Sequence, residues 1–289
     1  MANSRVLCIC VNYISDEETR DFVQSVEECT GGNRDIFVVS NSPSESLHEI
    51  ARPATGQPGE TRVFVHFANS NKGYFGGAAL GLELYLRDNP PPEWVMVSNV
   101  DISFPDQDFF QILKSYHSTG ASAVLAPDIL LQTRSILLSS QLHQNPAIRT
   151  RLSRAKLRCL HAVTCWYPLY WAFSLSSALR HSLVHLVGFD GHAKADNTLR
   201  PEEIYAPFGA CILFHRSYFE AGGTLEYPAF LFGEEIFVAE TARRWRLRVV
   251  YDPRLKLRHL AQGATRLVPT REVAGYLKES YAYLLGEFF

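Results

Sequence analysis

The sequence predicts an α/β fold built on a doubly wound, mostly parallel sheet. Over the first hundred residues, short apolar strand patterns alternate with helical segments, and this order is typical of parallel strands joined by right-handed crossovers. Several strand patterns are continuously apolar, as expected where helices cover both faces of a sheet. Polar residues follow at once where these patterns end. Because ligands of open α/β sheets bind beyond the carboxyl ends of the strands, we expect the functional site at that edge.

The elements of this fold are expected in a regular order. A strand at residues 5–11 leads to a helix at 16–29, for which Ser15 or Asp16 is the candidate N-cap. Further strands are predicted at residues 35–39, 62–67, 94–97 and 122–126, and further helices at 45–51, 78–87 and 107–118. The pattern resumes near residue 204, with strands at 212–214 and 249–251 and helices at 216–221, 236–245 and 270–289. We therefore expect one domain over residues 1–289.

A helical and aromatic insertion is expected between residues 130 and 200. Residues 145–161 are basic and helix-like, whereas residues 162–179 are uncharged and rich in Trp and Tyr. A stretch of this composition can make peripheral contact with an anionic membrane, or it can cover the core or form a contact in a homo-oligomer. Pro168 and several serine and threonine residues argue against a membrane-spanning helix.

The composition limits the classes of function. An apolar fraction of 46% and a charged fraction of 20% are ordinary for a soluble globular protein, and a net charge of −2 gives no basic footprint for nucleic acid. The six cysteines have no framework spacing and are expected to be reduced. Since the first strand begins directly after Ser4, no signal peptide is expected. These features predict a cytoplasmic protein, or one at the inner face of the membrane.

A carboxylate follows the buried strand at residues 94–97. That strand ends at Ser98 and Asn99, and Asp101 comes directly after them. Hard divalent cations prefer oxygen ligands, so Asp101 is a candidate charged ligand and Asn99 a candidate neutral one. The alternative is that Asp101 caps a helix beginning near Pro105.

A glycine-rich segment lies between the strand at 62–67 and the next helix. Glycine lets backbone N–H groups approach an anion or a flat ring, and a helix N-terminus adds positive potential. The spacing differs from that of the P-loop and of the dinucleotide-binding motif. A tight turn with close helix–sheet contact explains glycine here equally well. The candidate ligand-binding residues of this segment are Asn71, Lys72, Gly73, Gly76 and Gly77.

Two adjacent carboxylates, Glu234 and Glu235, follow an aromatic run and precede the helix at 236–245. A buried or crowded carboxylate has a raised pKa and can serve as a general base. An acid at a helix N-terminus can instead have a lowered pKa and only a structural role. His259 stands alone in a basic and apolar stretch, where a histidine is more often structural than a metal ligand.

Taken in order, these segments resemble the family 2 glycosyltransferases with the GT-A fold, most closely the rhamnosyltransferase-like branch. The resemblance covers about residues 5–126 and 204–265 and leaves the insertion unmatched. The strand ending at Asn12 and Tyr13 is similar to the family's opening strand, Ser40 and Asn41 stand at its Asp-Asn position, and residues 71–77 resemble its glycine-rich segment. Residues 98–101 stand at the place of its Asp-x-Asp metal motif, residues 208–210 at its acceptor-side Gly-Ala strand, and residues 233–235 at its Gly-Glu-Asp segment.

The resemblance implies an inverting transferase that moves a sugar, such as the deoxyhexose rhamnose, from a nucleoside diphosphate sugar to a hydroxyl of a saccharide or lipid-linked acceptor in surface polysaccharide synthesis. It implies Mg²⁺ or Mn²⁺ as cofactor, with Asp101 and His259 as metal ligands. Glu235, beside Glu234, would be the catalytic base, and Gly209 and Ala210 would lie on the acceptor side. The implied donor-binding residues are Asn12, Tyr13, Ser40, Asn41, Asn71, Lys72, Gly73, Gly76, Gly77 and Asn99.

Four positions depart from the family's pattern. Ser40, Asn99 and Glu235 each stand where the family usually has aspartate, and Phe237 replaces a further acid. Two other functions therefore remain open: a nucleotidyltransferase that forms a nucleotide sugar from a triphosphate, and a catalytically silent sugar-binding scaffold.

Overall fold

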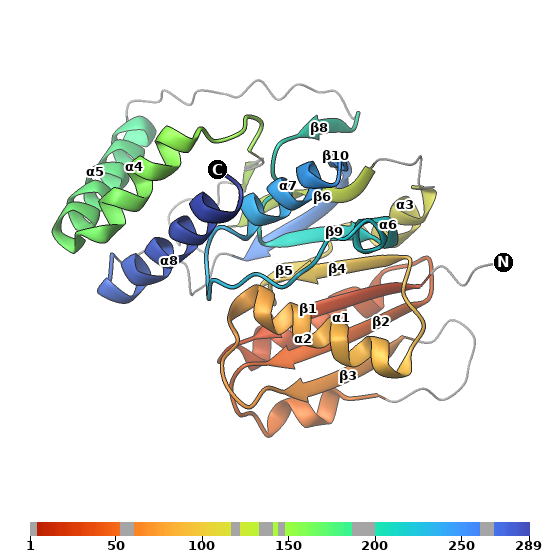
Figure 1. The fold of residues 1–289 in the computed structure, drawn as a ribbon. Coiled ribbons are helices and arrows are strands. Elements are labelled where there is room, and N and C mark those ends of the chain that lie inside the picture. Colours follow the sequence, from red (N-terminus) through yellow and green to blue (C-terminus); the bar gives the residue numbers. More distant parts are fainter. Residues whose placement is uncertain are drawn as a thin grey trace.

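The computed structural model describes residues 5–52, 61–116, 122–132, 141–143, 148–186, 200–260 and 269–289 (Figure 1). Its sheet has ten strands in the order β3-β2-β1-β4-β9-β6-β10-β5, with β7 beside β6 and β8 beside β10. The strands are β1 Val6–Asn12, β2 Arg34–Ser40, β3 Arg62–Phe67, β4 Trp94–Ser98, β5 Ile102–Ser103, β6 Ser122–Gln132, β7 Gln141–His143, β8 Glu202–Ile204, β9 Cys211–His215 and β10 Arg248–Leu260. The helices are α1 Asp16–Glu28, a 3₁₀ turn at Ser46–Ile50, α2 Gly73–Asp88, α3 Phe109–Ser115, α4 Arg154–Cys165, α5 Tyr167–Leu186, α6 Arg216–Glu220, α7 Glu234–Arg244 and α8 Arg271–Glu287.

The amino-terminal half of the sheet is parallel and covered on both faces, as the sequence predicts. β1 pairs in parallel with both β2 and β4, and β2 pairs in parallel with β3. Along β1, Leu7 and Ile9 pack on the side of α2, whereas Cys8 and Cys10 pack on the side of α1 and α3. Successive side chains of a strand point to opposite faces, so an apolar run without alternation fills two cores. The doubly wound arrangement is confirmed.

Strand β9 interrupts the parallel order. It lies between β4 and β6 and runs antiparallel to both. This direction brings the residues that precede β9 to the carboxyl end of β4, where the Asn99 N–H donates to the Ala210 carbonyl at 2.9 Å. Strand β10 is also longer than the strand predicted at 249–251. Its register shifts between Asp252 and Lys256, around Pro253, which has no N–H for a sheet ladder.

Helix α2 begins at Gly73 rather than near residue 78, so the predicted glycine-rich loop is the start of the helix. Gly73 has a φ of +72°, and a β-carbon there would lie 1.9 Å from the carbonyl oxygen of Phe230. A β-carbon on Gly77 would lie 2.8 Å from Val11 Cγ1. Glycine is therefore needed at these positions for close packing of the backbone.

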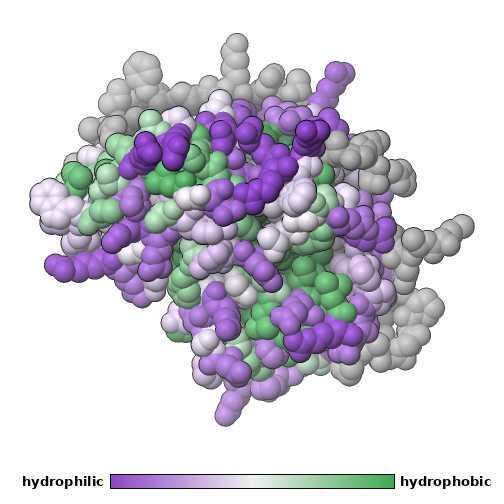
Figure 2. All heavy atoms as spheres, in the orientation of Figure 1, coloured by the Kyte–Doolittle hydropathy of each residue, from purple (hydrophilic) through white to green (hydrophobic). Residues whose placement is uncertain are grey.

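The insertion contributes two packed helices, α4 and α5, which lie beside α8 in one lobe (Figure 1). The side chains of Ser153 and Thr270 accept hydrogen bonds from backbone N–H groups at the starts of α4 and α8, and the Tyr167 hydroxyl joins the lobe to the Pro269 carbonyl at 2.6 Å. Hydrophobic and polar residues alternate over this lobe at the upper left of Figure 2. None of the described helices combines the length and apolar character needed to cross a bilayer.

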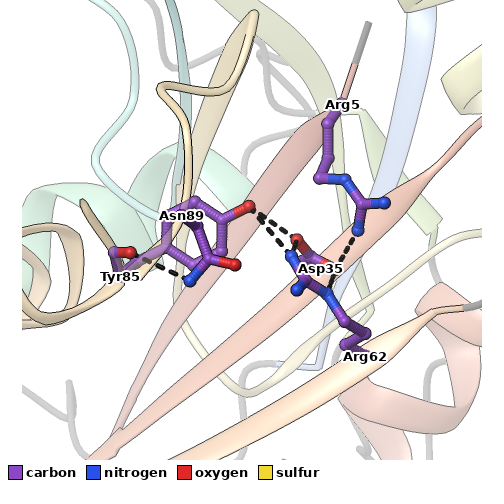
Figure 3. Close-up of polar contacts among 5 residues, drawn as sticks. All are labelled: Arg5, Asp35, Arg62, Tyr85 and Asn89. Atoms are coloured by element: carbon purple, nitrogen blue, oxygen red, sulfur yellow. Dashed lines mark hydrogen bonds and ion pairs between the residues drawn. The ribbon is translucent and has the colours of Figure 1, made fainter. Parts of the chain in front are cut away.

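A buried carboxylate links the amino-terminal ends of the parallel strands, at the edge of the sheet opposite their carboxyl ends (Figure 3). Asp35 of β2 is fully buried. It accepts hydrogen bonds from Arg62 Nε at 2.8 Å and from the Tyr85 hydroxyl at 2.6 Å, and it pairs with Arg5 at 2.5 Å. Burial, followed by the hydrogen bond to Asp35, raises the pKa of Tyr85. The network therefore links β1, β2, β3 and α2 at the edge remote from the carboxyl ends of the strands.

Replacing Asp35 with Ala is expected to lower the free energy of unfolding by about 3–5 kcal/mol, because two arginines in partly buried positions lose their counter-charge. Chemical denaturation monitored by circular dichroism measures this. Glu83→Ala removes a carboxylate from the exposed Glu83–Arg87 pair and is the matched control, with an expected change within about 0.5 kcal/mol. Equal effects of the two variants would contradict a structural role for the network.

Candidate functional site

A cavity of about 840 Å³ lies where β4 ends and β9 and α7 begin. The sheet edge contributes Asn99, Gly209, Ala210 and His259, and the start of α7 contributes Glu234 and Glu235. Helices α4, α5 and α8 close the other side with mainly apolar side chains. The remaining lining residues are Tyr74, Leu160, Val163, Thr164, Tyr170, Phe173, Ser174, Phe208, Leu231, Phe232, Leu277 and Tyr281.

His259 lines this cavity and contacts Asp101, which is not itself among the lining residues. The antiparallel pairing of β5 with β10 sets Ile102 opposite His259, and the Leu260 N–H donates to the Asp101 carbonyl at 2.8 Å. As a result, His259 Nε2 lies 3.0 Å from Asp101 Oδ2. The other polar atoms of the pair, Asp101 Oδ1 and His259 Nδ1, are buried and have no hydrogen-bond partner in the described part of the chain.

The spacing of these two side chains is compatible with a divalent cation. Two neighbouring ligands of an octahedral ion with bonds of about 2.1 Å lie about 3.0 Å apart, which matches the separation of Nε2 and Oδ2. No third His, Cys, Asp or Glu in the described residues joins them in a metal-binding group. The protein therefore offers two ligands, and an ion held there would need oxygens from a substrate or water.

Glu235 is held against the start of β9. Hydrogen bonds with the backbone of Glu235 itself and of Gly209 hold its carboxylate. A β-carbon on Gly209 would lie 2.6 Å from Glu235 Oε1, so glycine makes room for the carboxylate. Burial nevertheless raises the pKa of Glu235, because the charged form loses hydration that the backbone groups replace only in part.

Glu234 is 6% exposed. Burial, and then the charge of Glu235, raise its pKa to about 8. Both acids stand in the first turn of α7, where the helix dipole favours the anionic form. Because burial raises both pKa values, its effect exceeds that of the helix dipole. Near neutral pH the pair of carboxyl groups therefore tends to share a proton, which it can release or take up.

The loop before α7 is fixed by α8. The Tyr227 hydroxyl lies 2.9 Å from the Phe232 carbonyl oxygen, to which it donates, and 2.8 Å from the Ser280 hydroxyl. Gly233 has a φ of +85°, and a β-carbon there would lie 2.4 Å from Ser280 Oγ. These contacts fix where α7 starts and therefore where its two carboxylates point.

The Tyr74 hydroxyl is a buried donor at the cavity wall and has no hydrogen-bond partner among the described residues. Burial, followed by nearby Cys211 and the carboxylates of Glu234, Glu235 and Asp101, raises its pKa. Tyr74 is therefore a neutral hydrogen-bond donor between the acids of α7 and the acid after β4. An unmade hydrogen bond of this kind costs free energy, which a polar ligand could recover.

The predicted donor-binding residues at the ends of β1 and β2 make hydrogen bonds within the protein. Asn12 donates to Ser40 Oγ at 2.9 Å and to Asp16 Oδ1 at 3.1 Å. Asn41 accepts from the Lys72 N–H at 3.1 Å and donates to the Gly73 carbonyl at 3.0 Å. These side chains join the strand ends to the start of α2, and their contact with a donor remains a prediction.

Among the other predicted donor-binding residues Asn99 lines the cavity at Glu235, whereas Tyr13 and those between residues 71 and 77 do not. Lys72 and Gly76 line a separate hollow of about 410 Å³ between α2 and residues 219–226. Tyr13 is 55% exposed at the end of β1. The Asn71 side chain accepts from the Gly73 N–H at 2.9 Å, and Gly73 and Gly77 pack closely on other chain segments.

Several cavity residues are not identified by the sequence analysis. Tyr74 lies within the glycine-rich segment, and its position as an aromatic residue beside glycines could have marked it as a candidate site residue. Tyr281 lies on the predicted C-terminal helix, and burial raises its pKa to about 12. The lining residues of α4 and α5 carry no motif, because their position depends on how the insertion packs on α8.

Comparison with solved structures identifies the fold. Superposed on the crystal structure of GalNAc-T7 with UDP, GalNAc and Mn²⁺, the chain gives a TM-score of 0.58 at 12% sequence identity, over 96% of this chain and 48% of that one. The chain has the GT-A glycosyltransferase fold. At this level of identity the likeness concerns the fold alone.

One curated protein is similar in sequence. The low-salt glycan biosynthesis hexosyltransferase Agl10 of Haloferax volcanii is 24% identical over 243 residues, which is 83% of this chain. The chain covers 62% of the length of that relative. No protein-family model matches the chain.

Proposed function

We propose that this protein is an inverting, metal-dependent glycosyltransferase that uses a nucleoside diphosphate sugar. The observation that carries the proposal is the convergence of two charge centres on one cavity of a GT-A fold. Glu235 lies on its wall, and His259, in contact with Asp101, lies on the same wall. The similarity to a hexosyltransferase supports the same reaction class.

The reaction is a single displacement at the anomeric carbon. The Glu235 carboxylate accepts the proton of an acceptor hydroxyl, the acceptor oxygen forms a bond to the anomeric carbon, and the bond from that carbon to the diphosphate breaks with its electron pair on the diphosphate. Burial raises the pKa of Glu235, and a carboxylate with a raised pKa is a stronger base. The charge of Glu235 in turn contributes to the raised pKa of the adjacent Glu234.

Asp101 and His259 would hold Mg²⁺ or Mn²⁺, which would neutralise charge on the leaving diphosphate. The separation of 3.0 Å between His259 Nε2 and Asp101 Oδ2 supports this, and an ion bound by these two atoms would replace the hydrogen bond between them. We further propose that Asn99, Asn71, Lys72 and the residues at the ends of β1 and β2 contact the donor, and that Gly209 and Ala210 face the acceptor. The deoxyhexose donor remains a proposal from the family resemblance.

The acceptor side of the cavity is mainly apolar. Leu160 and Val163 of α4, Phe173 of α5, and Leu277 of α8 contribute to it. The hydroxyls of a free saccharide would find few hydrogen-bond partners on this apolar surface. The apolar part of a lipid-linked acceptor would instead be buried on it. This lining favours a lipid-linked acceptor over a free saccharide, in line with surface polysaccharide synthesis.

Isothermal titration calorimetry with a panel of nucleoside diphosphate sugars, with and without Mn²⁺, tests the proposal. A transferase is expected to bind one such sugar in a Mn²⁺-dependent way and to release nucleoside diphosphate when an acceptor is added. Preferential binding of a nucleoside triphosphate would indicate a nucleotidyltransferase. Binding of sugar without any release of diphosphate over the acceptors tested would favour a silent scaffold.

Replacing Gly209 with Ala is expected to lower kcat by about 10–100-fold with little loss of stability. The new methyl group would displace the Glu235 carboxylate, and a shift of about 1 Å in a catalytic group can cost this much. Steady-state kinetics and thermal melts measure the two effects. Gly275→Ala is the matched control, because no atom lies within 4 Å of a β-carbon there. Equal kcat values for the two variants would exclude a strict positional role for Glu235.

A further inference from the structure

The insertion concentrates positive charge in a chain of net negative charge. Residues 129–189 contain seven of the 28 Lys and Arg residues and none of the 30 Asp and Glu residues. Arg149 and Arg151 pair with Glu202 and Glu240 in the body of the protein. The cations at the start of α4 behave differently: Arg154, Lys156 and Arg158 are exposed, and no ion pair joins any of them to another described residue.

The same lobe exposes large apolar side chains. Trp166, between α4 and α5, is 64% exposed, and Trp171 of α5 is 48% exposed. Leu169, Phe173 and Leu175 are each more than 40% exposed. Of the described large hydrophobic residues that are exposed, most lie in this ten-residue stretch, which we call the α5 face. Up to residue 176, Tyr170 is the well-buried residue of α5. The exposed side chains of the α5 face flank it on two sides of the helix and are largely uncovered in the described part of the chain.

The α5 face adjoins the mouth of the cavity. Phe173 belongs to both, because it lines the cavity and is 43% exposed. Since α4 packs on α5, the free cations of α4 and the aromatic residues of α5 lie on the same lobe (Figure 1). The α4–α5 hairpin combines exposed tryptophan with arginine and lysine and has no acid, although the adjacent α8 exposes Glu272 and Glu279. This combination matches the interface of an anionic bilayer, where indole rings sit at the headgroup level and cations meet lipid phosphates.

We propose that the α4–α5 hairpin docks this protein on an anionic phospholipid bilayer and that the cavity opens beside the docked surface. Segregated charge favours the bilayer over a second copy of the chain. A self-associating pair would bring two sets of α4 cations together, whereas an anionic membrane neutralises them. This docking does not depend on the proposed catalytic activity.

Vesicle flotation tests the docking with the full chain and no donor or acceptor. Binding to phosphatidylcholine vesicles with 30% phosphatidylglycerol is expected to exceed binding to pure phosphatidylcholine by about tenfold, and 0.5 M NaCl should remove most of that difference. Trp166→Ser with Trp171→Ser, and separately Arg154→Glu with Arg158→Glu, should each lower binding by about tenfold or more.

Matched controls lie elsewhere on the surface. Trp245→Ser changes an exposed tryptophan outside the lobe, and Arg200→Glu with Arg248→Glu makes the same charge change at exposed positions. Thermal melts verify folding of every variant. The proposal is overturned if the protein does not bind anionic vesicles, or if the lobe variants bind them as well as the controls do. It is also overturned if light scattering shows a dimer that the tryptophan variant dissociates.

Discussion

Replacing Glu235 with Gln is expected to lower the rate of sugar transfer by about 10²–10⁴-fold, the usual contribution of a general base. The amide keeps the shape of the side chain and its place beside Gly209, but it cannot accept the proton of the acceptor hydroxyl. Donor affinity should change little, since Asp101 after β4 and His259 at the end of β10 are untouched. Release of nucleoside diphosphate, followed continuously, gives the rate, and calorimetry gives the donor affinity.

Two glutamates provide the comparison for this variant. Glu220→Gln changes an exposed acid at the end of α6 and should leave the rate unaltered. Glu234→Gln removes the neighbouring acid whose pKa is raised to about 8, so it should shift the pH dependence more than the maximal rate. Turnover by Glu235→Gln equal to that of the unaltered protein would remove Glu235 from the role of base.

The pH dependence follows from the raised pKa values. The base must be ionised, so kcat/KM is expected to rise with pH over a range above that of an ordinary glutamate, because burial raises the pKa of Glu235. Stability should change in the opposite direction. The folded pair binds protons more tightly than the unfolded chain, so its stabilising effect is complete below the unfolded pKa of 4.5 and is lost as pH rises toward about 8. Unfolding measured at pH 5 and at pH 8 tests this sign, and Glu234→Gln should reduce the difference.

Local patterns were sufficient to predict the parallel half of the fold. The apolar runs that became β1, β2 and β4 are short, continuous and ended by polar residues, and each of these features depends on the residue and its neighbours alone. The same locality explains why Asp101 and Glu235 could be selected. Each stands at the end of a strand or the start of a helix, where side chains face the ligand edge.

Features that depend on distant packing could not be predicted in this way. The extent of α2 into the glycine-rich segment is set by Asn41, which binds the backbone of residues 72 and 73. The length of β10 depends on parallel pairing with β6 on both sides of an irregularity at Pro253. The apolar wall of the cavity requires α4 and α5 to fold back onto α8, a contact with no signature in any single segment.

Replacing Asp101 with Asn is expected to weaken Mn²⁺-dependent donor binding by about 10–100-fold. Asp101 is the charged member of the proposed two-residue ligand set, and its contact with His259 Nε2 also orients the imidazole, so the neutral amide would remove a ligand charge and a positioning contact together. A titration of Mn²⁺ at fixed donor concentration measures the effect. Asp106→Asn, an exposed acid that pairs with Lys256, is the matched control. If donor affinity without metal is unchanged and only the Mn²⁺ response is lost, the acid acts through the ion. A Mn²⁺ titration that does not change would place the metal elsewhere and leave the Asp101–His259 pair as a structural contact.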